Sequence, residues 1–533
     1  MRYPLTKKEN LQRLSKIMSF DGQKVGQTLI DNLDESRVEI WKDVYYEFHD
    51  LIEKDRIFSK LPNRVMIRAY YSRECANYFS HVANFFKNLF VIPVLLFWKV
   101  FLVKFECLYY KNKYPEVSTL ENVKGGDFDF LFILNTRDHI ITALPVLERM
   151  NEMGKKILIV TFKEVYSKYI VDFNKLNNAK ILLFEYELKS LSINKCIGVL
   201  GESKSKFDTL ESYKMDADIK RVIQSDASYV KLHLKEELIQ YHFFKTIFDS
   251  FDLKGVVSIV LTTGFGIAKE RGIPTFILQH GIGGGGHYPY ISDYIIAYDD
   301  PTKDELDRWT DGTVTVLPLG APRFEYLAEA AKKLKRDDFN TRLGKPVDAR
   351  NVTFVSGGAE AFENRELFLA LKTLRQTMPD EVNFILKLHP REIFNFKKEI
   401  KKIFSKEELE KTIFIKKGTD FYEILVNSDV VISTESTGLL EAIAMDVPVI
   451  QVNFSDQSYT KQCDLSTFGG SKPIDNADIL TKEVLALIGK DEECEEMVER
   501  QILLKNKLFK NFGKCSEIVA KTIIEKSIKP DHD

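Results

Sequence analysis

The chain has 533 residues, of which 44% are hydrophobic and 29% are charged, and its formal net charge is -2. This length suits two or three globular domains with a large core, and the near-zero charge gives no compositional support for nucleic-acid binding. The six cysteines lie far apart without a C-x-x-C pair, which disfavours a zinc knuckle or a disulfide framework and suits the cytoplasm.

Residues 1–120 are predicted to form a helical extension, because VEIWKDVYYEFHDLIEKDRIF has helical periodicity. An apolar and aromatic run follows within residues 84–110, but its continuous apolar part, residues 89–98, is far shorter than the roughly 20 residues that span a bilayer. Two alternatives stay open for this run: an interfacial helix on a membrane, or a helix packed on the protein's own core. The first residues lack a secretory signal, so we expect a cytoplasmic protein, with a peripheral position on the inner face of the cell membrane as the alternative.

From Asp127 onward, short apolar segments alternate with helical stretches, which predicts parallel sheets with helices on both faces. The fold class is therefore α/β, with two Rossmann-like domains facing a cleft. The predicted boundaries are 121–330 for an acceptor domain, 350–515 for a nucleotide-donor domain and 516–533 for a tail. The expected strands lie within 128–134, 155–162, 179–186, 255–263, 274–279, 293–298, 351–357, 383–390, 412–418, 429–437 and 447–454.

Ligands of such sheets bind at the carboxyl ends of the strands, so the residues after each strand are the candidates for a site. The first group is Arg137, Asp138 and His139, which follow the segment FDFLFIL. Asp138 is a candidate base for deprotonating a hydroxyl, and Arg137 and His139 are acceptor-side candidates. The alternative is that Asp138 only caps the following helix.

The second group lies in LQHGIGGGGHYP, whose glycines satisfy the G-x-G-x-x-G pattern of a dinucleotide site. The context does not fit, because the glycines come late in the domain and precede a predicted turn and strand instead of a helix. We expect the glycines, beginning with Gly281, to allow motion or close approach to a ligand. His280, at the strand end, is the second candidate base, while His287 is an acceptor-side candidate that also fits an ordinary surface histidine.

The third group is in NFILKLHPRE, where Lys387, His389 and Arg391 alternate and so would point to one side of a strand. Three such donors suit a phosphate oxyanion, and the alternative is an exposed strand end with ordinary basic residues. Gly357, after the preceding strand, is assigned to the same nucleotide site.

The fourth group is in SDVVISTESTGLLEAIAMDVPVIQVNF, where a strand runs into hydroxyl residues and a helix predicted to start near Leu439. Hydroxyls and amides at a helix N-terminus can bind an anion. Glu441, expected in the first turn, is a candidate acceptor for ribose hydroxyls. The alternative is that Ser436 or Thr437 only caps the helix and Glu441 only complements its dipole. The assigned residues are Ser433, Ser436, Thr437, Gly438 and Glu441.

From about Asp127 to its end, the chain resembles glycosyltransferases of the GT-B type, and NTRDHIITALPVLERMNEMGKKILIVTF resembles their opening strand and helix. KLHP paired with STESTGLLEAIAMDVPVI resembles bacterial Kdo, sialic acid and polysialic acid transferases and CDP-glycerol glycerophosphotransferases. The resemblance implies that His389, Ser436 and Thr437 contact the donor phosphate. It also matches His280 and Gly281 to the strand-end H-G pair of the glycerophosphotransferases.

A second resemblance is to UDP-GlcNAc 2-epimerases, whose ribose-binding glutamate follows a serine-glycine-glycine turn. Glu441 matches that glutamate, but Thr437 replaces the first glycine and KLHPRE lacks the epimerase spacing of histidine and proline. Transfer is therefore favoured over epimerisation.

The predicted function is a metal-independent glycosyltransferase of bacterial-type capsule or lipopolysaccharide synthesis. It would move a sugar from a nucleotide-activated donor, CMP-linked and Kdo-like or sialic-acid-like, to a glycan or lipid-linked acceptor. Either Asp138 or His280 would be the base. The alternatives are a CDP-glycerol-type glycerophosphotransferase and a UDP-GlcNAc 2-epimerase-like isomerase. No D-x-D motif follows a strand, so no essential metal is predicted, and no cofactor beyond the donor.

Overall fold

The computed structural model describes residues 48–61 and 117–528, apart from short gaps. The gaps are 186, 188–192, 216, 218–219, 221–222, 225–226, 281–290, 311, 334–335, 357–364, 389–395, 416–419, 435, 455–463 and 490–491. The apolar run at 84–110 lies outside the described residues. Within the described ranges, no helix combines the length and apolar character needed to cross a bilayer.

The first domain is built on a seven-stranded parallel sheet with the order β3-β2-β1-β4-β5-β6-β7. All six strands expected in this half are confirmed. The sequence reading missed β7, a short edge strand that ends in a proline and is partly exposed. The strands are β1 (Phe130–Leu134), β2 (Ile157–Thr161), β3 (Ala179–Leu183), β4 (Gly255–Ser258), β5 (Thr275–Leu278), β6 (Tyr294–Ala297) and β7 (Thr315–Pro318).

The second domain has a five-stranded parallel sheet with the order β10-β9-β8-β11-β12. All five strands expected here are confirmed, and most of their residues are buried, as in a sheet with helices on both faces. The strands are β8 (Asn351–Val355), β9 (Asn383–Lys387), β10 (Thr412–Ile415), β11 (Val430–Ser433) and β12 (Val449–Gln451).

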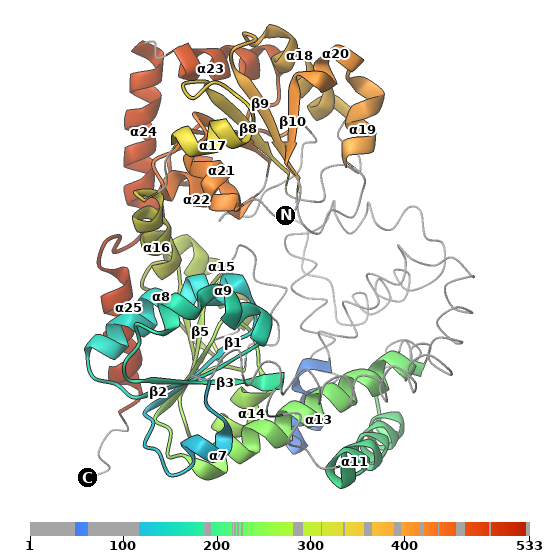
Figure 1. The fold of residues 1–533 in the computed structure, drawn as a ribbon. Coiled ribbons are helices and arrows are strands. Elements are labelled where there is room, and N and C mark those ends of the chain that lie inside the picture. Colours follow the sequence, from blue (N-terminus) through green and yellow to red (C-terminus); the bar gives the residue numbers. More distant parts are fainter. Residues whose placement is uncertain are drawn as a thin grey trace.

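Helices connect and cover the two sheets, and Figure 1 shows the two domains one above the other. In the first domain they are α7 (Leu120–Val123), α8 (Arg137–Glu152), α9 (Lys163–Phe173), α11 (Ile193–Ser212), α13 (Ala227–Ser250), α14 (Thr263–Glu270), α15 (Asp300–Thr310) and α16 (Pro322–Ala331). Those that follow are α17 (Arg336–Arg342), α18 (Arg365–Thr377), α19 (Phe396–Ile403), α20 (Lys406–Glu410), α21 (Phe421–Val426), α22 (Thr437–Ala444), η5 (Leu465–Phe468), α23 (Ala477–Gly489), α24 (Glu492–Leu508) and α25 (Cys515–Lys526).

The described part of the N-terminal extension, residues 48–61 with the short helix η1 (Arg56–Lys60), packs on the first domain. Its apolar side chains join a buried cluster with residues of α11 and α13. Lys60 Nζ donates to Glu237 Oε1 at 3.1 Å, and Thr263 Oγ1 donates to the other oxygen of the same carboxylate at 2.6 Å. This buried contact fixes the extension beside the start of α14, near the carboxyl end of β4.

The C-terminal helices return the chain to the first domain. Helix α24 runs from the second domain toward the first, and α25 packs against α8 and α16 (Figure 1). The carboxylate of Glu325, on α16, accepts hydrogen bonds from the main-chain nitrogens of Cys515 and Ser516, at 2.5 and 3.0 Å, and so holds the start of α25. The segment expected as a tail therefore includes most of an ordered helix. Two parallel-sheet domains joined in this way confirm the α/β two-domain fold class that the sequence predicts.

Candidate functional site

The carboxyl edges of the two sheets face each other, and two ion pairs join them. Arg137, at the start of α8, donates from Nη2 to both carboxylate oxygens of Asp420 at 3.1 Å. Arg323, in the first turn of α16, pairs with Glu441 of α22, and both side chains are buried. Charged groups from both domains therefore meet between the two sheets, where the strand patterns predict a cleft.

At the start of α8 the structure tests the capping interpretation of Asp138, while its role as a base stays a prediction. The capping residue is Thr136, whose hydroxyl accepts from the main-chain nitrogen of His139 at 3.4 Å, so the interpretation of Asp138 as the N-cap is wrong. Asp138 is exposed in the first turn of the helix, where its negative charge complements the helix dipole. The carboxylate is therefore accessible to solvent, and its charge acts on Glu441 of the second domain.

Two histidines meet at this edge. His139 is buried, and its Nδ1 accepts from the main-chain nitrogen of Asn135 at 3.1 Å, which leaves Nε2 to carry the proton of the neutral ring. The ring of His280, which follows β5, lies 5.5 Å from that of His139 between centroids, in an edge-to-face arrangement. The structure thus brings together two candidates that are 141 positions apart in the sequence. Gly281 and His287 lie outside the described residues, and the strand expected after the glycines is β6.

Glu441 is buried at the contact between the domains, where it pairs with Arg323. Helix α22 begins at Thr437, so Glu441 is in the second turn and not in the first turn as expected. Burial raises the pKa of its carboxyl to about 7, an effect that Arg323 opposes and the nearby charge of Asp138 reinforces. Its assignment to ribose hydroxyls stays a prediction, and in this structure one of its oxygens is already bound by Arg323.

The start of α22 is built largely by its own hydroxyls. Ser436 is the N-cap, and its Oγ accepts from the main-chain nitrogen of Gly438 at 3.1 Å, as the capping alternative expects. Ser433 is fully buried, and its hydroxyl donates to the carbonyl of Val355 at 2.6 Å. A Cβ on Gly438 would lie 3.0 Å from the ring of Phe421, so the close packing of α21 on α22 favours glycine there. Ser433 and Ser436 therefore have structural roles. Thr437 is half-buried at the first helical position, and its hydroxyl is the one of these three to which we assign no structural role.

Lys387 ends β9 and is buried, with its Nζ donating to the neighbouring Leu388 carbonyl at 2.8 Å. The other members of the predicted phosphate cluster, His389, Arg391 and Gly357, lie outside the described residues. Convergence of these groups on a phosphate stays a prediction.

The sequence reading missed the residue that links most of the site. Arg323 donates to the main-chain carbonyl of His280 and to Glu441, and its Nη2 lies 3.4 Å from the hydroxyl of Tyr422. The available signal was an arginine within LGAPRFEYL, directly after a helix-starting proline and before a core phenylalanine. A charged residue at such a position is rarely buried unless it is paired.

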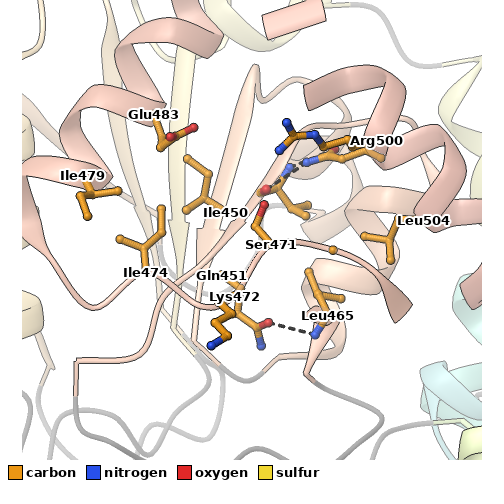
Figure 2. Close-up of a pocket in the computed structure, with 13 residues that line it drawn as sticks. Ile450, Gln451, Leu465, Ser471, Lys472, Ile474, Ile479, Glu483, Arg500 and Leu504 are labelled. Atoms are coloured by element: carbon orange, nitrogen blue, oxygen red, sulfur yellow. Dashed lines mark hydrogen bonds between the residues drawn. The ribbon is translucent and has the colours of Figure 1, made fainter. Parts of the chain in front are cut away.

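A separate pocket of 270 Å³ lies beside β12, between the strand, α23 and α24 (Figure 2). Its lining includes Gln451, Lys472, Glu483 and Arg500. Gln451 uses its side chain structurally, because Oε1 accepts from the main-chain nitrogen of Leu465 at 3.1 Å and Nε2 donates to the Thr434 carbonyl at 3.4 Å. None of the predicted site residues lines this pocket, so it is distinct from the contact between the domains.

The chain was compared with known families, curated proteins and solved structures. No protein-family model matches the chain, and no curated protein matches it in sequence. Among solved structures, a UDP-GlcNAc 2-epimerase from Neisseria meningitidis, bound to UDP-GlcNAc, is 16% identical with a TM-score of 0.46, covering 75% of this chain and 100% of its own. The UDP-GlcNAc 2-epimerase from Methanocaldococcus jannaschii is 16% identical with a TM-score of 0.45, covering 75% and 100%.

The wall teichoic acid polymerase TagF is 13% identical with a TM-score of 0.44, covering 80% of this chain and 98% of its own.

Proposed function

We propose that this protein is a glycosyltransferase of the GT-B type that works in the cleft between its two domains. It would transfer a sugar from a nucleotide-activated donor, CMP-linked and Kdo-like or sialic-acid-like, to a glycan or lipid-linked acceptor in surface-polysaccharide synthesis. The observation that supports this best is that candidate groups for a base and for anion binding lie on opposite domains at the contact between them. The histidine pair His139 and His280 lies on the first domain, and the start of α22 with buried Glu441 lies on the second.

The proposed reaction needs a base on one side and charge stabilisation on the other. The acceptor hydroxyl oxygen attacks the anomeric carbon of the donor, its proton passes to the imidazole of His280, and the bond from that carbon to the phosphate oxygen breaks. The electron pair of the broken bond stays on the leaving nucleotide. The positive end of α22 and the side chains of Lys387 and His389 would stabilise that charge.

We favour His280 over Asp138 as the base because of how each is held. The main chain at His280 is fixed by Arg323, and its ring packs against a second imidazole, whereas the Asp138 side chain is exposed. Imidazole is also the side chain whose ordinary pKa lies nearest neutrality, which suits a general base. In this proposal Asp138 tunes the charge of the cleft.

A ligand-induced stability screen tests the donor assignment. We expect CMP or CDP to raise the melting temperature of the full chain, since a ligand that binds the native state stabilises it, and we expect UDP, GDP and ADP to have smaller effects. His389→Ala is expected to remove the shift, and Asp138→Asn is expected to keep it. Stabilisation by UDP alone would exclude the cytidine donor, and the absence of any shift would contradict nucleotide binding altogether.

Turnover assays separate the alternatives. A transferase releases its nucleotide only when the acceptor is present, and a glycerophosphotransferase would do so with CDP-glycerol in place of a nucleotide sugar. An epimerase would instead convert UDP-GlcNAc without any acceptor, so that result would replace the transferase proposal.

A further inference from the structure

Arg323 makes contacts that span the whole site. Its Nη1 donates to the main-chain carbonyl of His280 in the first domain, and its Nη2 donates to Glu441 Oε1 in the second. The guanidinium is buried, and its side chain extends from α16, a helix that contacts α8 and α25 of the first domain and α21 and α22 of the second. A planar guanidinium presents its donors in a rigid fork, so the positions of its two partners are fixed relative to each other.

We propose that Arg323 is the positioning residue of the site, coupling the acceptor-side main chain at His280 to the donor-side carboxylate of Glu441. The role of this coupling in catalysis rests on the proposed function, but the coupling of the domains itself can be measured without any ligand. Arg323 binds Oε1 and Tyr422 makes a further side-chain hydrogen bond to the carboxylate. Because an ionised carboxylate has about four acceptor positions, capacity remains for the hydroxyls of a nucleotide ribose.

Arg323 also affects the ionisation of Glu441, because it is one of the charged groups around that carboxylate. The groups that face the carboxylate are Arg323 from α16, Arg137 and Asp138 from α8, Tyr422 from α21 and Tyr298 after β6. Helix α24 also packs on α22, but its Lys505 pairs with Asp446, beyond the end of the helix. Arg323 therefore supplies the closest positive charge, which favours the ionised carboxylate that accepts hydrogen bonds.

The expected pH dependence follows from the direction of the pKa shift. Burial raises the pKa of Glu441 to about 7, so the carboxyl is protonated below that pH and ionised above it. Nucleotide affinity should therefore fall as the pH drops through about 7. Without Arg323 the pKa rises further, and the same fall should begin at a higher pH.

The first arm of the test measures the distance between the two domains without any ligand. Spin labels introduced through unnatural amino acids at the exposed positions Val171, on α9, and Ile479, on α23, report the distance between the domains. We expect Arg323→Met and Glu441→Gln to broaden the distance distribution, and Arg323→Lys to broaden it less. Arg375→Met is the matched control, because Arg375 is also 3% exposed but lies on α18, within the second domain. An unchanged distribution in Arg323→Met would overturn the coupling.

The second arm measures the dissociation constant of the nucleotide found by the stability screen, from pH 6 to about pH 9. For Arg323→Met we expect nucleotide binding to be at least about tenfold weaker than in the unmodified protein at pH 7.5. The difference between the two dissociation constants should become smaller at higher pH, because Glu441 is ionised again there. Arg323→Lys should keep a profile close to that of the unmodified protein, and Arg375→Met should match it. An equal loss at every pH would mean that Arg323 acts on the shape of the site alone and would overturn its electrostatic role.

The two arms separate the failure of this inference from the failure of the proposed function. If no nucleotide binds to the unmodified protein, the proposed function fails, while the distance measurement still decides whether Arg323 couples the domains. If nucleotides bind but the variants of Arg323 change neither the distance nor the pH profile, only the inference fails.

Discussion

Replacing Gly320 with alanine is expected to destabilise the protein by about 3 kcal/mol or more, because the new methyl group would collide with the C-terminal crossover. Gly320 has a φ of 113°, which side chains rarely adopt, and a Cβ there would lie against the Lys510 carbonyl and 2.8 Å from Cys515 Sγ. The crossover would have to move away from α16 to make room. Chemical denaturation of the full chain, followed by circular dichroism, measures the change.

Gly312→Ala is the matched control for this substitution. Gly312 also has a positive φ, 73°, but no atom lies within 4 Å of the position that a Cβ would occupy. The control should therefore show only the backbone penalty, roughly 1–2 kcal/mol. Equal losses in the two variants would mean that the contact between Gly320 and the crossover contributes nothing.

Replacing His280 with glutamine is expected to lower kcat by roughly 10²–10⁴-fold, the usual contribution of a general base. The stabilisation by nucleotide should remain, because the substituted side chain follows β5 in the first domain and the proposed nucleotide site is in the second. The contact with Arg323 should remain as well, since Arg323 binds the main-chain carbonyl and not the imidazole. Steady-state kinetics with the donor identified by the stability screen, together with melting temperatures, would separate these two effects.

Asp138→Asn is the control for the choice of base. Asn keeps the size of the exposed side chain and removes its charge, and we expect a much smaller loss of kcat than in His280→Gln. The reverse order, with a large loss in Asp138→Asn and little change in His280→Gln, would assign the base to Asp138.

Local patterns in the sequence were sufficient for the sheets. Eleven of the twelve strands were expected, because buried parallel strands are continuous apolar runs with loops or helices between them. The missed strand, β7, is short and lies at the sheet edge. Its residues are partly exposed, so it does not need to be a continuous apolar run. The strand expected after the glycines is confirmed as β6, the next described element after β5, while the rejection of a dinucleotide site there stays a prediction.

The candidate site was predictable in part. The segments after β1, β5 and β11 supplied His139, His280 and Glu441, and the structure brings the first two together at the edge of one sheet. Capping chemistry could not be resolved, because several residues in each loop were able to cap. Thr136 does so in place of Asp138, and Ser436 does so in place of Thr437.

The sequence by itself therefore determined the two parallel-sheet domains and the strand ends that are followed by polar candidate residues. Both depend on hydrophobic periodicity and turn residues, which are set by residues close together in the chain. Only the tertiary structure decided that Arg323 meets Glu441, 118 positions later, and that Arg137 meets Asp420, 283 positions later. The physical reason is that the charge state of Glu441 and the joining of the two domains depend on burial and on partners from the opposite domain. No local pattern encodes either of them.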